Sequence, residues 1–294
     1  MMKSIRMRTL IALMVSVVAI SVGAASFTGA FPFSASSPSP SPINCEVTNP
    51  LTDTYLAKWK AAHKAKRYHI TVIDLATDCT YQASDTSSSH AMASTAKVMI
   101  AVGVLERVDS GTLTYSSVHK DLHEMITVSS NTAAVRLLRR MGGRPMMQKV
   151  INQFGLTHTF TAKSFGITRT TSDDQARLLR AVLVDGTQYL SPKSSSRIRS
   201  LMRSVTPSQR WGAGHGLPAG YTAAVKNGWY HTSPGDLPPV NRSRVNTIGV
   251  VYDPQGQPRR ILTGYSDMWR SDKRGIAAWN SLSDHVADVL TATP

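Results

Sequence analysis

The chain has 294 residues, of which 41% are hydrophobic and 17% charged, so it has ample material for one large domain or two small ones. Its formal net charge of +15 makes nucleic acid the first partner to consider, but the cations are dispersed and no nucleic-acid-binding motif accompanies them. We therefore exclude nucleic acid, and for an exported protein we expect an anionic cell-wall polymer or a membrane surface as the counterpart of this charge.

The N-terminus has the pattern of a secretory signal peptide. Cations within the first eight residues precede the apolar run LIALMVSVVAISVGAA, and small residues suited to cleavage follow at 23–25. The run is shorter than the roughly 20 residues that span a bilayer, so a retained anchor is the alternative. We predict a signal peptide over 1–30 and a Pro/Ser-rich linker over 31–44, since SASSPSPSP cannot form a core. The protein is expected to be secreted, either extracellular or associated with the cell wall.

Two cysteines follow the signal, Cys45 and Cys79. In an oxidising compartment one disulfide is the simplest use of a pair, and two separate thiols are the alternative. The predicted bridge would join the N-terminal segment to the first hairpin.

The folded part is predicted to begin with a helix and a hairpin. Asn49 and Pro50 suit the N-cap and first turn of a helix, and apolar residues from Leu51 to Trp59 recur at helical spacing. In YHITVIDLATDCTYQAS, two β-branched runs flank a turn at 76–79, which predicts a hairpin.

The middle of the chain, from Ser94 to about Val205, is predicted to be mostly helical. After the loop WGAGHGLPAG, the stretches YTAAVKNGWY, VNTIGVVYD and RRILTGYSD are typical of strands, and GIAAWNSLSDHVADVL of an amphipathic helix. Because strands at both chain ends flank a helical middle, we predict an α+β fold with three layers, α/β/α. An antiparallel sheet from both ends of the chain is flanked by helices and carries an inserted helical subdomain, all within one domain over 45–294.

The stretch HAMASTAKVMIA places Ser94 and Lys97 three residues apart, on one face of a helix. A lysine in a water-poor pocket can lose its charge and act as a base, and a serine becomes a good nucleophile beside such a base. Taken alone, the spacing is common, and an ordinary helix with Lys97 reaching solvent explains it equally well.

Two further polar motifs follow. The triplet Ser129–Asn131 heads an apolar-periodic segment and, taken alone, is typical of a helix N-cap. The stretch Lys226–Trp229, KNGW, lies in a predicted strand, where a lysine is usually an outward-facing charge. In this order, however, S-x-x-K, S-x-N and K-x-G are the motif set of class A β-lactamases and penicillin-binding proteins.

The chain resembles the secreted class-A-like serine hydrolases of actinobacteria from Leu51 to its C-terminus. MASTAKVMIAVGVLERVDSG is similar to the family's nucleophile helix, VSSNTAAVRLL to its S-D-N segment and VKNGWY to its K-T-G strand. TRTTSDDQARLLRAVL is similar to the threonine-rich helix start between them. The resemblance implies the fold shared by β-lactamases and D,D-peptidases.

The resemblance also implies a role for each matching residue. Ser94 would attack a carbonyl, Lys97 would take its proton, and Ser129 would pass a proton to the departing nitrogen. Asn131 would hold the substrate's amide side chain, and Lys226 would favour a substrate carboxylate.

Two more residues complete the substrate-binding set. The oxyanion hole implied by the resemblance is formed by the backbone N–H groups of Ser94 and Trp229. Asn227 stands where the family has threonine or serine, and Ser130 where it has aspartate. Both are small and polar, so we expect each to keep a hydrogen-bonding role.

One departure from the family is larger. A class A β-lactamase needs a glutamate upstream of the threonine-rich helix start to activate the deacylating water, and no Asp or Glu lies between Met125 and Ser172. Asp173 and Asp174 come too late and are typical of acids in a helix's first turn. Since a positioned base contributes about 10²–10⁴-fold in rate, we expect acylation without efficient β-lactam hydrolysis.

No metal site or cofactor is predicted. His119 and His123 are four residues apart, but no third ligand accompanies them, and the glycines of WGAGHG precede a strand rather than follow one. We expect a monomeric, exported active-site-serine hydrolase acting on a D-alanyl peptide or another small amide or ester. The alternatives are a β-lactamase with an unusual deacylation route and a non-catalytic cell-wall-binding protein that kept the fold.

Overall fold

The computed structural model describes residues 44–232 and 241–291. The predicted signal peptide (1–30) and nearly all of the predicted linker (31–44) lie outside the described residues. The strands are β1 (Lys66–Asp74), β2 (Cys79–Ser84), β3 (His90–Ala91), β4 (Arg169–Thr170), β5 (Thr222–His231), β6 (Ser243–Tyr252) and β7 (Pro258–Asp267). The α-helices are α1 (Asp53–His63), α2 (Ala96–Asp109), α3 (Tyr115–Thr127), α4 (Asn131–Met141), α5 (Gly143–Gln153), α6 (Ser172–Arg180), α7 (Pro192–Arg203) and α8 (Asp272–Thr291). Shorter helical turns are η1 (Ala93–Thr95), η2 (Phe165–Ile167), η3 (Ala181–Asp185), η4 (Pro207–Gln209) and η5 (Gly212–Gly214).

The main sheet is antiparallel and is built from both ends of the chain, as predicted. Its order is β2-β1-β7-β6-β5, so the N-terminal hairpin pairs with the last strand, with Val72 opposite Leu262. This arrangement leaves β5, which carries the KNGW stretch, as an edge strand.

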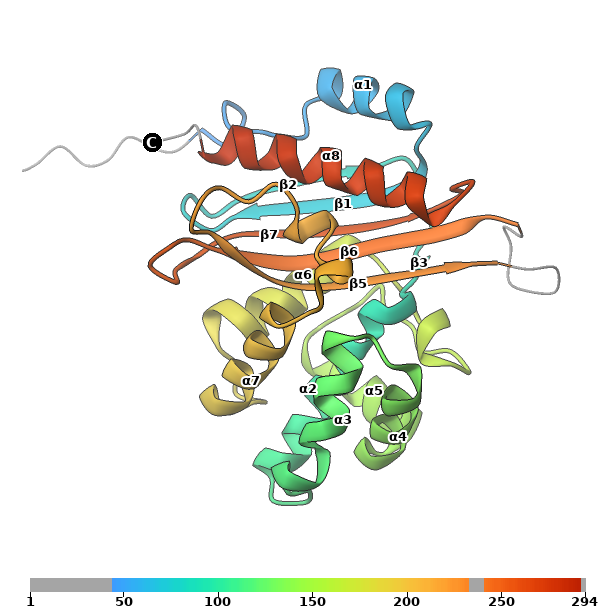
Figure 1. Ribbon diagram of the computed structural model, residues 1–294, viewed down its shortest axis with the longest axis vertical. Coiled ribbons are helices and arrows are strands. Elements are labelled where there is room, and N and C mark those ends of the chain that lie inside the picture. The colour runs from blue at the N-terminus through green and yellow to red at the C-terminus, as the bar shows by residue number, and fades with distance from the viewer. Residues whose placement is uncertain (1–43, 233–240, 292–294) are drawn as a thin grey trace, which may run out of the picture. The chain divides into compact units, whose positions relative to one another are not determined.

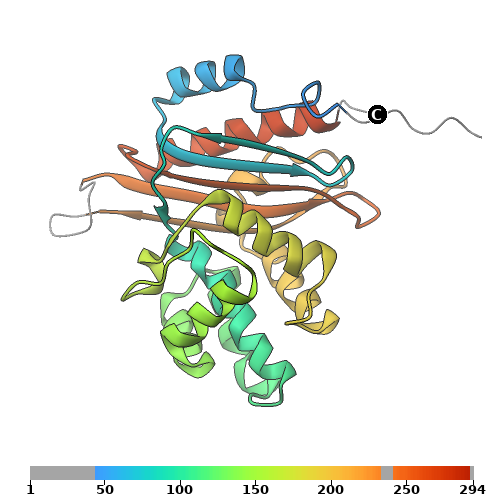
Figure 2. The same ribbon diagram turned by 180° about the vertical axis from the view of Figure 1, so that it is seen from behind.

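Helices cover both faces of this sheet (Figures 1 and 2). α1 and α8 lie on one face, and the helices from α2 to α7 lie on the other. Every residue of β6 is buried, because a strand inside a sheet that is covered on both faces has no side exposed to water. The predicted α/β/α layering with an inserted helical part is therefore confirmed.

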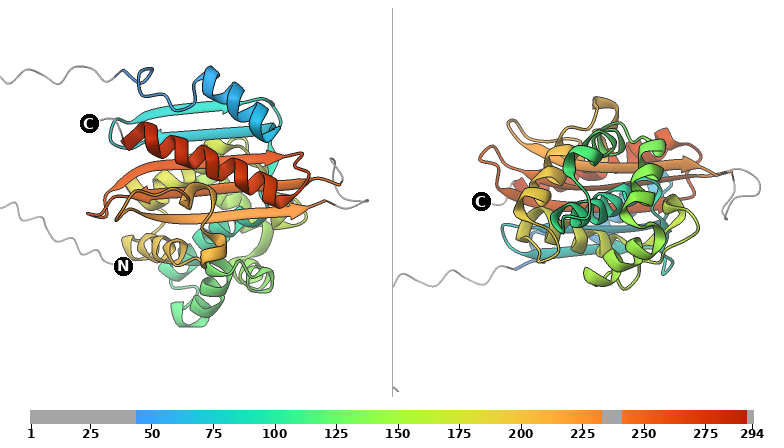
Figure 3. Two further views of the ribbon diagram at one scale, coloured as in Figure 1. Left: turned by 45° about the horizontal axis from the view of Figure 1, so that its top comes forward. Right: turned by 90° about the horizontal axis from the view of Figure 1, so that it is seen from below.

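The face under α8 is packed closely around tryptophans. The Trp279 indole donates to the Val245 carbonyl at 2.8 Å, and the Trp59 indole of α1 donates to the Ala278 carbonyl at 2.9 Å. A Cβ at Gly264 of β7 would occupy the space of the Trp279 ring, so only glycine allows this approach. α8 lies lengthwise on the sheet as a result (Figure 3, left).

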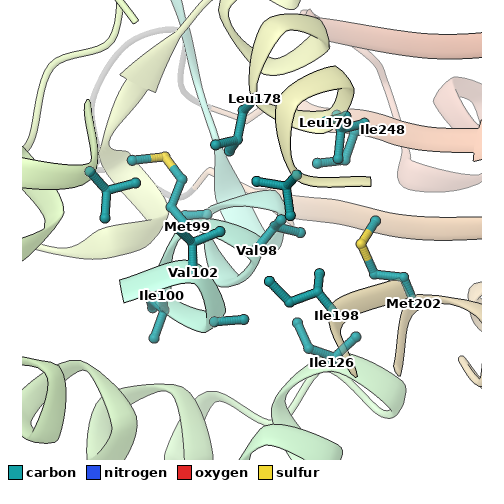
Figure 4. Close-up of a cluster of buried hydrophobic side chains, with 14 of the residues drawn as sticks. Val98, Met99, Ile100, Val102, Ile126, Leu178, Leu179, Ile198, Met202 and Ile248 are labelled. Carbon is teal, nitrogen blue, oxygen red and sulfur yellow. The ribbon is translucent and has the colours of Figure 1, made fainter. Parts of the chain in front are cut away.

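The opposite face packs on α2, which is surrounded by other helices (Figure 3, right). Its residues from Ala96 to Leu105 are all buried, and Val98, Met99 and Val102 meet side chains of α6 and α7 (Figure 4). The residues that follow Ser94 thus lie in a helix buried over three turns, which limits how far the turn that carries Ser94 can move.

The first helix begins three residues later than predicted. α1 starts at Asp53 with Thr52 as its N-cap, whose hydroxyl accepts from the Tyr55 N–H at 3.3 Å. Asn49 instead accepts from the Leu51 N–H at 2.8 Å and closes a separate turn that contains Pro50. Asn49 and Thr52 are both suitable capping residues, and the burial of Leu56 and Trp59 favours a helix that begins after Thr52.

Cys45 and Cys79 form a disulfide, as predicted, with their Cα atoms 5.6 Å apart. Cys79 begins β2 and is buried, whereas Cys45 is exposed. The bridge holds the N-terminal segment against the sheet, where the Thr48 hydroxyl also contacts the Tyr81 hydroxyl.

The substitution Cys45→Ser is expected to lower the free energy of unfolding by about 2–4 kcal/mol, because the bridge closes a loop with a sequence separation of 34 residues. Urea unfolding of the variant and of the native protein, each with and without reductant, measures the loss. Reductant should shift the native midpoint to that of the variant and leave the variant unchanged. Two alkylatable thiols in unreduced native protein would contradict the prediction.

Candidate active site

Ser94 lies in the short turn η1, two residues before α2 begins, and Lys97 lies in the first turn of α2. The Lys97 ammonium donates to the Ser94 hydroxyl at 2.9 Å, and the Lys97 side chain is 0% exposed. The interpretation that Lys97 reaches solvent is therefore wrong. Ala93, immediately before the serine, has a φ of 50°, a left-handed conformation that a non-glycine residue adopts at a cost of about 1–3 kcal/mol.

A side chain that was not predicted holds the chain before this turn. The amide of Asn246, on β6, donates to the carbonyls of Ala91 and Met92 at 2.9 and 3.2 Å. Both donors come from one buried amide group, so the sheet fixes the approach to η1.

The triplet Ser129–Asn131 both caps a helix and lies beside Lys97. The Ser130 hydroxyl caps α4, accepting from the Ala133 N–H at 3.2 Å, so the N-cap interpretation is confirmed for that residue. The residues on either side turn to Lys97, which donates to the Ser129 hydroxyl at 3.1 Å and to the Asn131 amide oxygen at 2.8 Å. Ser129 has a φ of 61°, which also brings its carbonyl to within 2.6 Å of the Lys97 ammonium.

Lys226 reaches the same point from the sheet. Its ammonium donates to the Ser129 hydroxyl at 3.0 Å and to the Asn227 carbonyl at 3.0 Å, and its side chain is 0% exposed. Ser94, Lys97, Ser129 and Lys226 thus form one unbroken series of polar contacts between η1, α2, the α3–α4 loop and β5.

Burial changes the acidity of both lysines. Desolvation lowers the pKa of Lys97 to about 8. Desolvation, followed by repulsion from Lys97, lowers the pKa of Lys226 to about 7. Near neutral pH the pair therefore holds a neutral amine in part of the molecules, and its protons titrate jointly.

The alternation of side chains along β5 separates Lys226 from its neighbour. The Asn227 amide lies on the other face of the sheet, is 0% exposed, and donates to the carbonyls of Gln209 and Trp211 at 2.8 and 2.9 Å. The structure therefore does not bring the Asn227 side chain to the other predicted site residues. It anchors β5 to the chain that precedes it.

Trp229 takes part in the site through its backbone. Its ring packs on Trp211, with the centroids 5.9 Å apart, on the side of the sheet that faces away from Lys226. Ser243 of β6 lies opposite His231 of β5, but its backbone N–H and carbonyl bond to Trp269 on the other side of β6. The N–H of His231 therefore forms no hydrogen bond to β6 and points away from the sheet. Two residues along, the N–H of Trp229 likewise points out of the sheet edge.

Gly228 lets this edge approach Ser94. A Cβ at this position would lie 2.6 Å from the Ser94 backbone nitrogen and 3.0 Å from the Met92 carbonyl oxygen. Only a residue without a side chain allows the contact, which explains the glycine of K-x-G. The backbone N–H groups of Ser94 and Trp229 thus come from two segments in direct contact.

An open cavity of about 220 Å³ lies beside Ser94. It is lined by Ala93, Ser94, Asn131, Ser164, Phe165, Gly166, Ile167, Trp229 and Tyr230. The sequence analysis did not identify the segment 164–167 or Tyr230. Strand alternation could have identified Tyr230, which shares the Lys226 face of β5, whereas the 164–167 segment carries no polar motif.

The segment 164–167 occupies the place opposite Lys97. The Phe165 ring lies over the Lys97 ammonium, with its centroid 5.8 Å away. No Asp or Glu is among the residues that line this cavity within the described parts of the chain. Asp173 and Asp174 lie in the first turn of α6, as predicted. Asp174 holds the chain that precedes this segment, because it accepts from the His158 N–H and the Thr159 hydroxyl at 2.8 and 2.7 Å.

His119, considered above as a metal ligand, lies in α3, where its ring nitrogen contacts the Ser116 carbonyl at 2.9 Å. Over 44–232 and 241–291, no three His, Cys, Asp or Glu side chains gather as a metal site requires. Within the same residues, no helix is both long and apolar enough to cross a membrane.

Comparisons with known proteins agree with this geometry. A sequence model described as the beta-lactamase enzyme family matches residues 114–290, a range that includes Ser129 and Lys226 and begins after Lys97. A search of curated proteins found no match.

Solved structures share the fold. The chain is similar to a class A beta-lactamase from Bacteroides cellulosilyticus, with 17% identity and a TM-score of 0.69 over 83% of this chain and 99% of that one. It is also similar to a beta lactamase from Burkholderia vietnamiensis, with 22% identity and a TM-score of 0.67 over 82% and 97% of the two chains. An ancestral class A beta-lactamase gives 22% identity and a TM-score of 0.64 over 82% and 99%.

Proposed function

Because this chain belongs to the beta-lactamase enzyme family and is a serine hydrolase of that type, we propose that Ser94 is its nucleophile and forms an acyl-enzyme with a D-alanyl peptide or a similar small amide or ester. One observation carries the proposal: the polar contacts from Ser94 through Lys97 and Ser129 to Lys226, with both lysines buried.

Acylation begins with a proton transfer. Neutral Lys97 accepts the proton of the Ser94 hydroxyl, whose oxygen attacks the substrate carbonyl carbon. The contact of 2.9 Å between the two groups is within the range needed for direct transfer. Negative charge that develops on the carbonyl oxygen is stabilised by the N–H groups of Ser94 and Trp229, and a donor of this kind contributes about 10²–10³-fold in rate.

The tetrahedral intermediate collapses when the leaving nitrogen gains a proton. Ser129 supplies it, because its hydroxyl contacts both lysines and can be reprotonated from either. The positive charge shared by Lys97 and Lys226 favours a substrate that carries a carboxylate near the scissile bond. Asn131, which lines the cavity, is available to hold a substrate amide.

For hydrolysis of the acyl-enzyme, the cavity offers no carboxylate among the described residues that could act as a general base for water. The cavity wall opposite Lys97 is formed by Phe165 rather than by a carboxylate. We therefore favour slow hydrolysis of the acyl-enzyme, or transfer of its acyl group to an amine acceptor, over the rapid deacylation of an efficient β-lactamase. Family membership keeps a β-lactamase with another deacylation route as the second candidate.

We propose that the protein acts outside the cell as a monomer. The signal pattern at 1–30 and the linker at 31–44 support export, and the Cys45–Cys79 disulfide is consistent with an oxidising compartment. The substrate would then be a peptidoglycan peptide or a small molecule in the same compartment.

A fluorescent penicillin tests the proposal. The proposed enzyme becomes covalently labelled and stays labelled through gel electrophoresis in denaturant. An efficient β-lactamase would consume the probe and leave little label on the protein. A non-catalytic wall-binding protein would never be labelled, and that result would contradict the proposal.

The rate of labelling is expected to rise with pH between about 6 and 9 and then to level off. Lys97 must be neutral to accept the serine proton, and burial lowers the pKa of Lys97 to about 8 and that of Lys226 to about 7. Time courses of labelling across this pH range measure the titration of Lys97 and Lys226, and circular dichroism is the control for folding. A rate that does not change between pH 6 and 9 would exclude a lysine base.

A further inference from the structure

A second cavity, of about 190 Å³, lies at the end of the sheet where α1 leads into β1 and β7 leads into α8. In Figure 1 this is the right-hand end of the sheet. The cavity is lined by His63, Lys64, Lys66, Arg242, Met268, Trp269, Arg270 and Arg274. It shares no residue with the cavity beside Ser94.

Its lining is strongly cationic. Two lysines, three arginines and one histidine face the cavity, and no carboxylate does so among the described residues. None of these lysines and arginines forms an ion pair within 44–232 and 241–291. The neighbouring carboxylate of Asp267 is taken by Arg67 at 2.8 Å. Among the described residues, positive charge therefore gathers here without an ion-pair partner.

Several residues that line the cavity occupy positions that are unfavourable for a cation or for a residue with a side chain. Arg274 lies in the first turn of α8, where the partial positive charge of the helix end disfavours a cation. Lys64 and Met268 adopt left-handed conformations, with φ of 56° and 75°.

We propose that this cavity binds the phosphate groups of an anionic glycerol-phosphate or sugar-phosphate polymer. Lysine and arginine donors around a concave site match the charge and the acceptor oxygens of a phosphodiester. The volume accommodates one phosphate with part of its neighbouring unit. The site would hold the enzyme on such a polymer without taking part in the chemistry at Ser94.

Other phosphate sources fit less well. Binding of single-stranded nucleic acid relies on exposed aromatic rings for base stacking, whereas Trp269 is 3% exposed. Membrane binding relies on apolar side chains that enter the bilayer, and the exposed large hydrophobic residues of the described chain, Val47, Val128, Val135 and Phe160, line no part of this cavity.

A triple variant with a charge-matched control tests the proposal. Lys64→Gln/Arg270→Gln/Arg274→Gln removes three cavity cations, and Arg139→Gln/Arg144→Gln/Lys193→Gln removes three exposed cations elsewhere. Binding of a fluorescent glycerol-phosphate oligomer is measured by anisotropy at several salt concentrations. We expect the cavity variant to lose at least tenfold in affinity with a shallower salt dependence, and the control to lose less than threefold.

The same measurement with duplex DNA and with phosphatidylglycerol vesicles separates the sources of phosphate. The proposal expects the oligomer to bind more tightly than either at equal phosphate concentration. Equal losses in the two triple variants, or tighter binding to DNA or vesicles, would overturn it. Penicillin labelling should be unchanged in the cavity variant, so a failure here is distinct from a failure of the role proposed for Ser94.

Discussion

Replacement of Ser94 by alanine is expected to abolish covalent labelling by a fluorescent penicillin without unfolding the protein. The hydroxyl is the only group removed, and its contact in the site is the hydrogen bond that it accepts from Lys97 at 2.9 Å. The chain just before η1 remains held by Asn246, so the fold does not depend on the hydroxyl. Mass spectrometry of intact protein after incubation with the probe measures the adduct.

Lys97→Met provides the companion test, because methionine keeps most of the volume of the buried side chain but cannot accept a proton. Labelling should slow by about 10²–10⁴-fold, the usual contribution of a positioned general base. Thermal unfolding of both variants controls for loss of structure. Equal labelling of native protein and Ser94→Ala would remove Ser94 from the role proposed for it, whatever Lys97→Met shows.

Mixing the enzyme with a penicillin is expected to open about one equivalent of β-lactam bond in a burst, with the ring-opened penicillin retained on Ser94, and then very little. Lys97 is the base proposed for acylation, whereas the wall opposite that lysine is the ring of Phe165. A deacylating water would therefore lack a base, which corresponds to about 10²–10⁴-fold in the rate of hydrolysis. Stopped-flow absorbance of the β-lactam bond measures the burst and the steady state together.

The placement of Phe165 allows a gain-of-function version of this test. Phe165→Glu would put a carboxylate in the segment that lines the cavity beside Ser94, and steady-state turnover should rise, by up to about 10²-fold. Phe165→Gln is the matched control, since it has the same shape without the charge. Efficient multiple turnover by the native protein would mean that another group activates water, and the β-lactamase candidate would then be correct.

The sequence by itself determined the secondary-structure elements and the order of the three motifs along the chain. Alternating β-branched runs and helical spacing are local properties, so the hairpin, the three late strands and the last helix were predicted close to their bounds. The motifs around Ser94, Ser129 and Lys226 were also visible, because their short spacings depend on one turn or one strand. The start of α1 was missed by three residues, since two adjacent segments have suitable capping residues and only packing selects between them.

Tertiary structure decided what surrounds the nucleophile. Whether Lys97 is buried, and with it the low pKa that lets it act as a base, depends on side chains from four separate segments. Phe165 and Asn246 reach the site from a loop and a central strand that no motif marks, and strand alternation turned Asn227 away from it. The cationic cavity at the far end of the sheet likewise joins residues about 200 positions apart, such as Lys66 and Arg270. Charges so distant in sequence become one site only when the first and last strands pair.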